Sequence, residues 1–427
     1  MYDEIETASR SEIRDLQNER LAETVRHAYE SIPFYREHLD DAGVSPAAVD
    51  SVDALEAVPF TTKAAFREEY PTGLVAVDDA ELRRIHASSG TTGKSKIVAY
   101  TAADLDAWAE VCARSLSAAG VRPGETVQNA CGYGLFTGGI GWHQGAERLG
   151  TTVVPAGAGG TGRQIELIRD LGTDSLVCMP SYALYLAETV ADGGGDPAGL
   201  PLSTVPVGAE PSTAAMRREI ADRFGAVVTE NYGLSELFGP GVATECATAR
   251  DGMHLWEDHF YPEVVDPETG DPVTGDEPGE LVLTSLTKEA LPVLRYRTGD
   301  LVELTTEPCE CGRTHARISM RGRTDSLLIV RGVNVYPTEV ESVLLEFDGL
   351  LPQYRIDLSR EEALDRFSIT AEYDPDAVDD AATLRERLAE RLRNVLGLSP
   401  DALDLVPRGD LDRTETGKVQ RVYDHRE

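Results

Sequence analysis

The sequence predicts an α/β protein with a large N-terminal domain, in which parallel sheets form several subdomains, followed by a small α+β domain. A chain of 427 residues is too long for one compact core. Strand and helix patterns alternate between residues 97 and 225, and a separate mixed pattern fills residues 325–427. We therefore expect two domains, residues 1–324 and residues 325–427.

The elements of the larger domain follow from hydrophobic periodicity. Residues 1–85 contain helical patterns separated by proline-containing turns. The region that follows contains four strand candidates, at residues 126–131, 151–155, 175–179 and 226–230. Amphipathic helical patterns between them cover residues 163–171 and 181–191. This alternation is typical of a mostly parallel sheet covered by helices.

The pattern changes beyond Gly239. Short strands and turns follow, for example at residues 279–286 and 301–304. The C-terminal segment is predicted to form a strand, a helix, a strand and a helix, at residues 327–330, 337–347, 367–373 and 381–396. We find no internal repeat and no low-complexity tract.

Charge and hydropathy limit the classes of function. The net charge of -34, from 40 basic and 74 acidic residues, argues against nucleic-acid binding. Acidic runs such as residues 376–380 indicate solvated surface, and the overall charge suits a protein that works in high salt, where screening weakens self-repulsion. No apolar run reaches the ~18 residues of a membrane span, and the acidic N-terminus shows no secretory pattern. We expect a cytoplasmic protein.

The six cysteines are too few for a disulfide framework in a chain of this size. Cys112, Cys131 and Cys178 lie in apolar or helical contexts and are predicted to be plain buried residues. Cys309 and Cys311 are separated by one residue in a turn. Such a turn can hold Zn²⁺ if two further ligands are supplied.

The strongest local motif is the run Ser-Ser-Gly-Thr-Thr-Gly-Lys-Ser-Lys at residues 88–96. Its glycines permit tight turns that leave amide N–H groups and hydroxyls free to face an anion. A P-loop would need glycine at the position of Ser88, so the P-loop interpretation fails. A flexible surface loop stays open as the alternative for this segment taken alone.

A second glycine cluster, at residues 157–162, has the G-x-G-x-x-G spacing of a dinucleotide site between a strand and a helix. In such a site the next strand ends in an acidic residue that binds the ribose. Here that strand ends in Cys178, Met179 and Pro180. The dehydrogenase hypothesis is therefore weak.

Further motifs combine glycine with charged or aromatic residues. Residues 230–236, Glu-Asn-Tyr-Gly-Leu-Ser-Glu, follow a β-rich run and could stack a base and bind Mg²⁺. Residues 296–300 and 322–325 each place a charged residue beside a glycine in an expected turn, and residues 414–418 place a lysine on a C-terminal loop. Alone, each motif is more often a turn or a surface residue than a site.

Taken in order, these motifs resemble the adenylate-forming superfamily of acyl-CoA synthetases, and most closely the phenylacetate–CoA ligase family. Other blocks with this resemblance are residues 59–63, 133–139, 208–211, 256–260 and 331–337. The resemblance runs from about residue 20 to the end and covers the kind, order and spacing of the blocks. It implies an AMP-forming ligase that uses ATP, Mg²⁺ and coenzyme A to convert an aromatic carboxylic acid, through an acyl-adenylate, into a thioester.

The resemblance also implies where ATP and coenzyme A bind. The pyrophosphate part of ATP would be held by Ser89, Gly90, Thr91, Thr92, Gly93 and Lys94. Adenine and ribose would be held by Gly208, Ala209, Glu210, Glu230, Asn231, Tyr232, Gly233, Asp300 and Arg323. The small domain would be mobile, turning about a hinge at Asp325 and offering Arg331 and Gly332 to coenzyme A.

Catalysis, by the same resemblance, depends on Lys418, Glu236 and Arg323. Lys418 would bridge the substrate carboxylate and the α-phosphate, where a compact point charge serves better than a guanidinium. Glu236 would bind Mg²⁺. Flat apolar walls and glycines suit an aryl pocket, and the residues expected to line it are Tyr133, Phe136, Gly138 and Ala209.

Members of the resembled family carry a structural zinc, which implies a closed, non-catalytic site. Its ligands would be Cys246, His254, Cys309 and Cys311, with His259 and His315 as reserve ligands. The alternative is a set of reduced side chains without a metal.

The chain departs from the family pattern at Ser95, where proline is common, and at Ser212, where an aromatic residue is common. The second departure leaves the size of the aryl group open. The functional alternatives are an adenylating enzyme that passes its acyl group to a carrier protein or an amine, and a non-catalytic nucleotide-binding relative. A homodimer is compatible with the sequence, which leaves the oligomeric state open.

Overall fold

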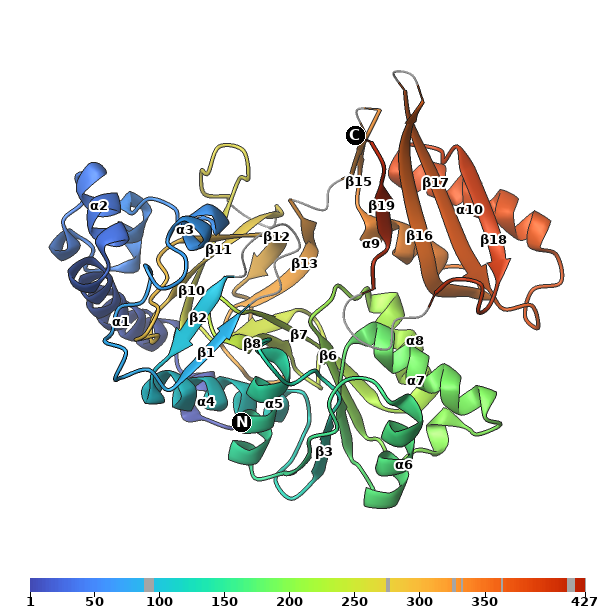
Figure 1. Cartoon of the computed structure of the whole chain (residues 1–427), viewed down its shortest axis with the longest axis horizontal. Coiled ribbons are helices and arrows are strands. Elements are labelled where there is room, and N and C mark those ends of the chain that lie inside the picture. Colours follow the sequence, from blue (N-terminus) through green and yellow to red (C-terminus); the bar gives the residue numbers. More distant parts are fainter. Residues whose placement is uncertain are drawn as a thin grey trace.

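The computed structural model describes residues 1–87, 96–273, 277–324, 328–331, 333–361, 364–412 and 419–426. It confirms the predicted α/β fold, with a large N-terminal body and a smaller C-terminal body (Figure 1). Within the described residues, no helix is long and apolar enough to cross a membrane.

An eleven-stranded sheet forms the centre of the larger body, in the order β10-β11-β12-β13-β9-β8-β7-β6-β5-β3-β4. The strands from β4 to β7 are parallel, and those from β7 to β10 are antiparallel. The parallel strands are β3 (Thr126–Asn129), β4 (Thr152–Val154), β5 (Ser175–Val177), β6 (Thr204–Gly208) and β7 (Val227–Leu234). The antiparallel strands are β8 (Gly239–Glu245), β9 (Met253–Leu255), β10 (Phe260–Val265), β11 (Gly279–Ser285), β12 (Tyr296–Thr305) and β13 (Arg317–Arg323).

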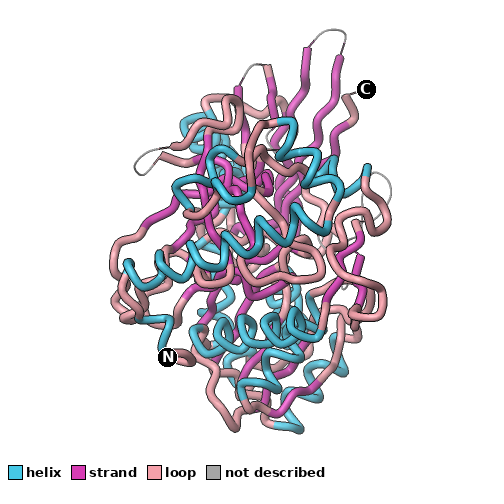
Figure 2. Tube along the Cα trace, turned by 90° about the vertical axis from the view of Figure 1, so that its left-hand side faces the viewer, coloured by secondary structure: helices cyan, strands magenta, loops and turns pink. Residues whose placement is uncertain are grey.

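Helices cover this sheet and form two cores with it. Six of the helices are α1 (Arg10–Ser31), α4 (Ala102–Ala118), α5 (Gly138–Leu149), α6 (Thr161–Leu171), α7 (Pro180–Asp192) and α8 (Ala214–Phe224). The helices α1, α4 and α5 pack against the antiparallel strands in one core, whereas α6, α7 and α8 pack against β5, β6 and β7 in a second core. Figure 2 shows helices in front of the sheet on the α1 side.

Shorter elements complete the larger body. A hairpin of β1 (Arg84–Ala87) and β2 (Ile97–Tyr100) flanks residues 88–95. The remaining short helices are η1 (Glu4–Thr7), α2 (Pro33–Asp41), η2 (Pro46–Ala48), η3 (Val52–Ala57), α3 (Lys63–Glu68) and η4 (Pro197–Gly199).

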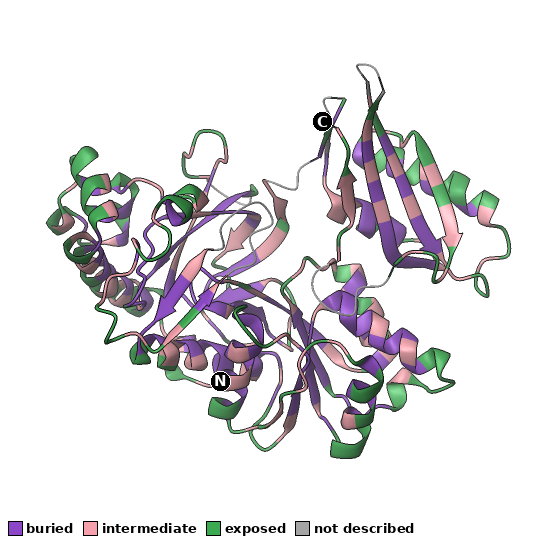
Figure 3. Ribbon diagram, in the orientation of Figure 1, coloured by how far each residue is buried: buried purple, intermediate pink, exposed green. Residues whose placement is uncertain are grey.

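The smaller body has its own core between a sheet and two helices (Figure 3). The sheet order is β18-β17-β16-β19, and a separate hairpin joins β14 to β15. Its elements are β14 (Leu328–Val330), β15 (Val333–Val335), α9 (Pro337–Leu344), β16 (Leu350–Glu361), β17 (Leu364–Tyr373), α10 (Ala381–Leu396), β18 (Ala402–Pro407) and β19 (Val422–Asp424).

The expected turn at residues 296–300 is wrong, and in the motif at residues 322–325 Gly322 and Arg323 still belong to a strand, with a turn, among the described residues, only at Thr324. The first motif begins β12 and the second ends β13, and Asp300 pairs with Arg323 in the register of these strands. Gly299 has φ +77° and Gly322 has φ +147°. A shift of register follows directly after Leu301. The glycines therefore mark an irregular part of a strand pair, where a side chain is re-aimed, and not a chain reversal.

Candidate active site

Three of the predicted nucleotide-binding residues meet where the last residues of β7 and β13 approach Asp300 in β12. The hydroxyl of Tyr232 donates to Oδ2 of Asp300 over 2.7 Å, and Arg323 forms an ion pair with Oδ1 of the same carboxylate. Asp300 is 5% exposed, and its backbone N–H donates to Thr298. The carboxylate is thus held by two side chains that the sequence predicts for the same site.

Glu236, the expected Mg²⁺ ligand, lies next to this group and is buried. Its Oε1 accepts a hydrogen bond of 2.7 Å from Tyr296 and forms an ion pair with Lys96. Burial opposes the charged form of Glu236, but Lys96 and Tyr296 outweigh it and hold the pKa of this carboxyl below its usual range. An ionised, partly desolvated carboxylate is a suitable ligand for a hard cation.

A second lysine lies behind Glu236. The Lys288 ammonium donates to the Glu236 carbonyl oxygen over 3.0 Å and lies 4.8 Å from the centroid of the Tyr100 ring. It is 3% exposed. Burial lowers its pKa to about 8, against the opposing effect of Asp104 and Glu236. Lys288 therefore supports the backbone of the predicted metal ligand.

The motif at residues 208–210 borders the same end of the parallel strands. Gly208 ends β6, and a Cβ there would lie 2.5 Å from the Asn231 carbonyl oxygen, so only glycine fits. Ala209 has a positive φ of +73°. Glu210 turns away toward α7, where its Oε1 accepts from the Ser181 N–H over 2.7 Å.

Glu230 has partners other than the residues around Asp300. Its carboxylate accepts from Ser212 (2.9 Å) and Arg217 (2.9 Å), and Arg217 also contacts Glu245. Burial raises the pKa of Glu230 to about 7, with Arg217 opposing the shift and Glu245 adding to it. These contacts support a role for Glu230 in holding α8 against β7 and β8.

Asn231 and Gly233, also predicted in the motif at residues 230–236, contact the backbone of the neighbouring strand β8. The amide oxygen of Asn231 accepts from Gly241 over 3.4 Å, whereas its buried Nδ2 has no hydrogen-bond partner in the described part of the chain. A Cβ at Gly233 would lie 1.9 Å from the Gly239 carbonyl oxygen. Glycine at this position therefore allows β7 and β8 to approach.

Three of the four predicted aryl-pocket residues lie in the β3–α5 loop (residues 130–137) and at the start of α5, whereas Ala209 follows β6. The Tyr133 hydroxyl accepts from Asn129 Nδ2 over 2.9 Å and lies 3.1 Å from His143 Nδ1. A Cβ at Gly138 would meet the Phe136 ring at 2.8 Å. Tyr133 and Phe136 are 39% and 42% exposed. They are thus solvent-accessible aromatic surfaces that a ring could cover.

Some predicted residues lie outside those that the structure describes. They are the phosphate-loop residues Ser89, Gly90, Thr91, Thr92, Gly93 and Lys94, the hinge Asp325, the coenzyme A candidate Gly332 and the catalytic candidate Lys418. Arg331 is described, has a φ of +52° and pairs with Asp401 within the small body.

The two bodies touch beside the candidate site. The N–H of Val419 lies 3.5 Å from Oε2 of Glu210, and Arg408 forms a 2.9 Å ion pair with Asp192 at the end of α7. In Figure 1, α7 and α8 lie directly below the small body. Val419 directly follows the predicted catalytic Lys418 in the sequence and is the first described residue after it.

The four predicted zinc ligands form one cluster. The ligand atoms of Cys246, His254, Cys309 and Cys311 all lie within 4.8 Å of one another. The Cys246 and Cys309 sulfurs are 3.8 Å apart, and the Cys311 sulfur lies 3.4 Å from His254 Nε2. The reserve ligands do not join them, because His315 contacts the Ile5 carbonyl and His259 contacts Thr287.

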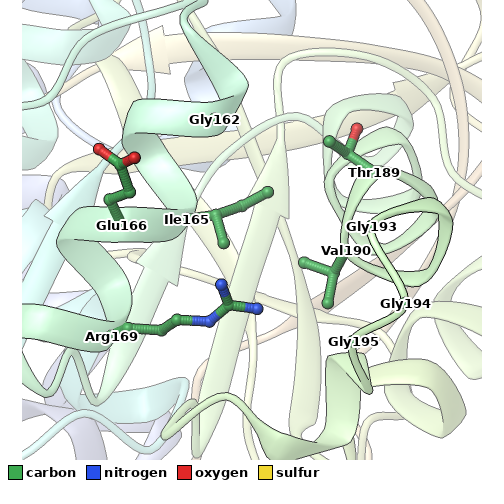
Figure 4. A pocket seen from close by; sticks show the side chains of 9 residues that line it. All are labelled: Gly162, Ile165, Glu166, Arg169, Thr189, Val190, Gly193, Gly194 and Gly195. Atoms are coloured by element: carbon green, nitrogen blue, oxygen red, sulfur yellow. The ribbon is translucent and has the colours of Figure 1, made fainter.

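A surface cavity of about 450 Å³ lies elsewhere, between α6 and the end of α7 (Figure 4). Its lining residues are Gly162, Ile165, Glu166, Arg169, Thr189, Val190, Gly193, Gly194 and Gly195. None of the residues predicted for ATP, acid or metal lines it. The cavity is therefore separate from the candidate active site.

Comparison with known proteins identifies the family. The AMP-binding enzyme family matches residues 14–287, and the AMP-binding enzyme C-terminal domain matches residues 332–426. Phenylacetate-coenzyme A ligase of Thermus thermophilus is 49% identical, over 99% of both chains. The chain belongs to the phenylacetate–coenzyme A ligase family. The enzyme of the same name from Escherichia coli K12 is 46% identical, over 99% of this chain and 97% of the relative.

Solved structures agree with this family membership. A 2-hydroxyisobutyryl-CoA ligase in the postadenylation state has a TM-score of 0.92 at 29% identity, with 98% of this chain and 91% of that chain covered. The same ligase in the thioesterification state has a TM-score of 0.73 at 31% identity, with coverage of 99% and 91%. The orientation of the small body here is thus closer to the postadenylation arrangement.

Because the chain belongs to a ligase family, the dehydrogenase hypothesis for residues 157–162 is rejected.

The sequence analysis did not predict the contacts of Lys96 and Lys288 with Glu236. It also did not predict the ion pair between Arg217 and Glu230. A signal for the lysines existed, because Lys96 and Lys288 are two of only five lysines in the chain. Arg217 could not be singled out, since it is one of many arginines, on a helix with no motif.

Proposed function

We propose that this chain is an ATP-dependent aryl-acid–coenzyme A ligase. It joins a carboxylate to AMP with release of pyrophosphate, and then transfers the acyl group to the thiol of coenzyme A with release of AMP. The observation that carries this proposal is the near-full-length identity of 46–49% with phenylacetate–coenzyme A ligases. The cluster of Tyr232, Asp300 and Arg323 beside Glu236 supports it.

Asp300 is the proposed ribose ligand. Its two oxygens, aligned by Tyr232 and Arg323, can each accept a hydrogen bond from a ribose hydroxyl. Tyr232 offers a ring face to adenine beside Gly208 and Ala209. Glu236 is the proposed ligand of the Mg²⁺ that accompanies ATP, and Lys96 would have to leave its carboxylate for the metal to bind.

Adenylation brings the substrate carboxylate toward the α-phosphate, so two anions must approach each other. In the proposal, the N–H and hydroxyl groups of residues 89–94 hold the pyrophosphate, and Lys418 neutralises charge at the carboxylate and α-phosphate. The position of Val419 beside Glu210 supports an approach of Lys418 to this end of the sheet. Rotation of the small domain about Asp325 would then exchange Lys418 for Arg331 and Gly332, which face coenzyme A.

The acid would lie against the β3–α5 loop. Tyr133 and Phe136 provide aromatic walls, while Gly138 and Ala209 leave room for a ring. Ser212, where an aromatic residue is common in this family, is hydrogen-bonded to Glu230 and Arg217 and so is held away from the ring.

The cysteine–histidine cluster fits a structural zinc ion. A tetrahedral site with Zn–S bonds of about 2.3 Å places its sulfurs roughly 3.8 Å apart, and the Cys246 and Cys309 sulfurs are separated by 3.8 Å. Nδ1 of His254 faces the His315 carbonyl at 3.4 Å, which leaves Nε2 for the metal. We propose Zn²⁺ held by Cys246, His254, Cys309 and Cys311. A cytoplasmic location and a homodimeric assembly stay predictions.

The proposed substrate class is tested by acid-dependent ATP–pyrophosphate exchange in high salt. The panel contains phenylacetate, benzoate, an indole acid and aliphatic acids of similar size. We expect the exchange rate at subsaturating acid to be highest with an aryl acid. A preference for aliphatic acids would contradict the aryl assignment but leave the adenylation reaction intact.

A further inference from the structure

The strand before the predicted phosphate loop and the loop that carries the aryl-pocket residues meet at one carbonyl group. The Leu135 carbonyl oxygen accepts from the backbone N–H of Ala87 over 2.9 Å and from Nδ1 of His86 over 2.9 Å. His86 and Ala87 end β1, directly before residue 88. Leu135 lies in the middle of the β3–α5 loop.

The ring of His86 is fixed by its surroundings. It makes edge contacts with Tyr100, at 5.7 Å and 88°, and with Trp108, at 5.6 Å and 86°. Neither ring forms its polar hydrogen bond with His86, because the Tyr100 hydroxyl donates to the Phe238 carbonyl and the Trp108 indole N–H donates to the Pro240 carbonyl. His86 is 1% exposed, so it cannot easily turn to other partners.

The hydrogen bond to Leu135 assigns the tautomer of His86. A carbonyl oxygen can only accept, so Nδ1 carries the proton and Nε2 is an acceptor. Nε2 has no hydrogen-bond partner in the described residues, and burial lowers the pKa of the ring, which favours the neutral form. A buried nitrogen without a partner costs stability, so packing alone does not account for histidine here.

The β3–α5 loop has little apolar burial to hold it. Leu135 is 68% exposed, and Tyr133 and Phe136 are also exposed. Hydrogen bonds therefore decide its position. Besides the Leu135 carbonyl, Thr137 contacts the Ser235 hydroxyl at 3.2 Å, immediately before Glu236.

We propose that His86 is a positioning residue, which fixes the β3–α5 loop through the Leu135 carbonyl to the strand leading into the phosphate loop. The proposal rests on the proposed function, which assigns this loop to the acid. In this role His86 would act through the loop, without contact with ATP or the acid. Its loss should displace the aromatic walls and weaken acid binding, with a smaller effect on the chemical step.

Two polar substitutions separate this role from simple packing. In His86→Asn the amide nitrogen can occupy the position of Nδ1 and donate to the Leu135 carbonyl. In His86→Gln it reaches the position of Nε2, and the Leu135 carbonyl keeps only the hydrogen bond from the Ala87 N–H. We expect the Asn variant to keep KM for the acid within about twofold of wild type. The Gln variant should raise that KM by about 3- to 10-fold, the effect of one lost hydrogen bond, with a smaller change in kcat.

Hydrogen–deuterium exchange in the full chain gives a readout that needs no activity. Peptides covering residues 130–137 should exchange faster in the Gln variant than in the Asn variant. Equal deuterium exchange of residues 130–137 and equal KM for the acid in the two variants would overturn the positioning role. If wild type showed no ATP–pyrophosphate exchange in the presence of any aryl acid, the proposed function would be refuted instead. The hydrogen–deuterium comparison would still decide the role of His86.

Discussion

Tyr232 and Asp300 form a hydrogen bond of 2.7 Å although their strands, β7 and β12, are separated in the sheet by β8, β9 and β13. The sheet must therefore bend enough to bring Tyr232 near the end of β7 to Asp300 within β12. Arg323 reaches the same carboxylate from β13. The proposed ribose site is thus built from β7 and from the consecutive strands β12 and β13.

Asp300→Asn tests this site. The substitution keeps the shape but removes the charge that attracts the ribose hydroxyls, and charge-assisted hydrogen bonds are about twice as strong as neutral ones. We expect KM for ATP to rise roughly 10- to 100-fold, from the loss of about 1.5–3 kcal/mol, with KM for the acid almost unchanged. Tyr232→Phe is the matched control, because it keeps the ring and should change KM for ATP by only about 3-fold. An unaltered KM for ATP in Asp300→Asn would rule out the ribose role.

Lys418→Ala tests the division of labour between the two half-reactions. The ammonium is proposed to act only when the carboxylate attacks the α-phosphate. ATP–pyrophosphate exchange should fall by about 100-fold or more, the usual effect of removing a charge-stabilising group, while a preformed acyl-adenylate should still be converted to the thioester at a rate near that of wild type. Equal loss of both half-reactions would contradict the assignment.

Removal of zinc should lower thermal stability clearly and change KM little. Metal binding to a closed site contributes directly to the free energy of folding. We expect one zinc per chain in wild type, and a lowered Tm with little or no zinc in Cys309→Ser. Cys131→Ser, outside the cluster, should keep its zinc. Wild type purified without zinc, and insensitive to chelators, would remove the metal from the account.

Glu230 should make stability depend on pH. Its pKa is raised from 4.5 to about 7 in the folded protein, chiefly by burial. Between these values the folded state binds a proton that the unfolded state releases, so the free energy of unfolding falls as the pH rises from about 4.5 to 7. Glu230→Gln should flatten this decline in Tm, and the exposed Glu386→Gln should not. A decline of the same slope in Glu230→Gln would assign the effect to other groups.

The sequence predicted most of the parallel half of the fold. Four of its five strands and the helices α6 and α7 lie where hydrophobic periodicity places them, as does α10 in the smaller body. It did not reveal β6 or β16. The pattern of β16 is interrupted by charged residues such as Arg355 and Asp357, which pair with each other on the sheet surface. The motif around Gly299 was taken for a turn because glycine favours turns locally, and pairing with β13 overrides that preference.

Within the site, the sequence identified which residues belong together better than it identified what each side chain contacts. Tyr232, Asp300 and Arg323 meet as predicted. The contacts of Glu230 with Arg217 and of His86 with the Leu135 carbonyl join residues 13 and 49 positions apart. Such contacts depend on the packing of helices and loops, for which no local pattern exists.

The most direct test of the central claim is the product balance in a single reaction with phenylacetate, ATP and coenzyme A, measured by mass spectrometry. We expect one phenylacetyl-CoA and one pyrophosphate for each AMP formed. Without coenzyme A, we expect only a single turnover to enzyme-bound phenylacetyl-AMP. Formation of ADP, or continued AMP release without a thioester, would contradict the assignment of this chain as an aryl-acid–coenzyme A ligase.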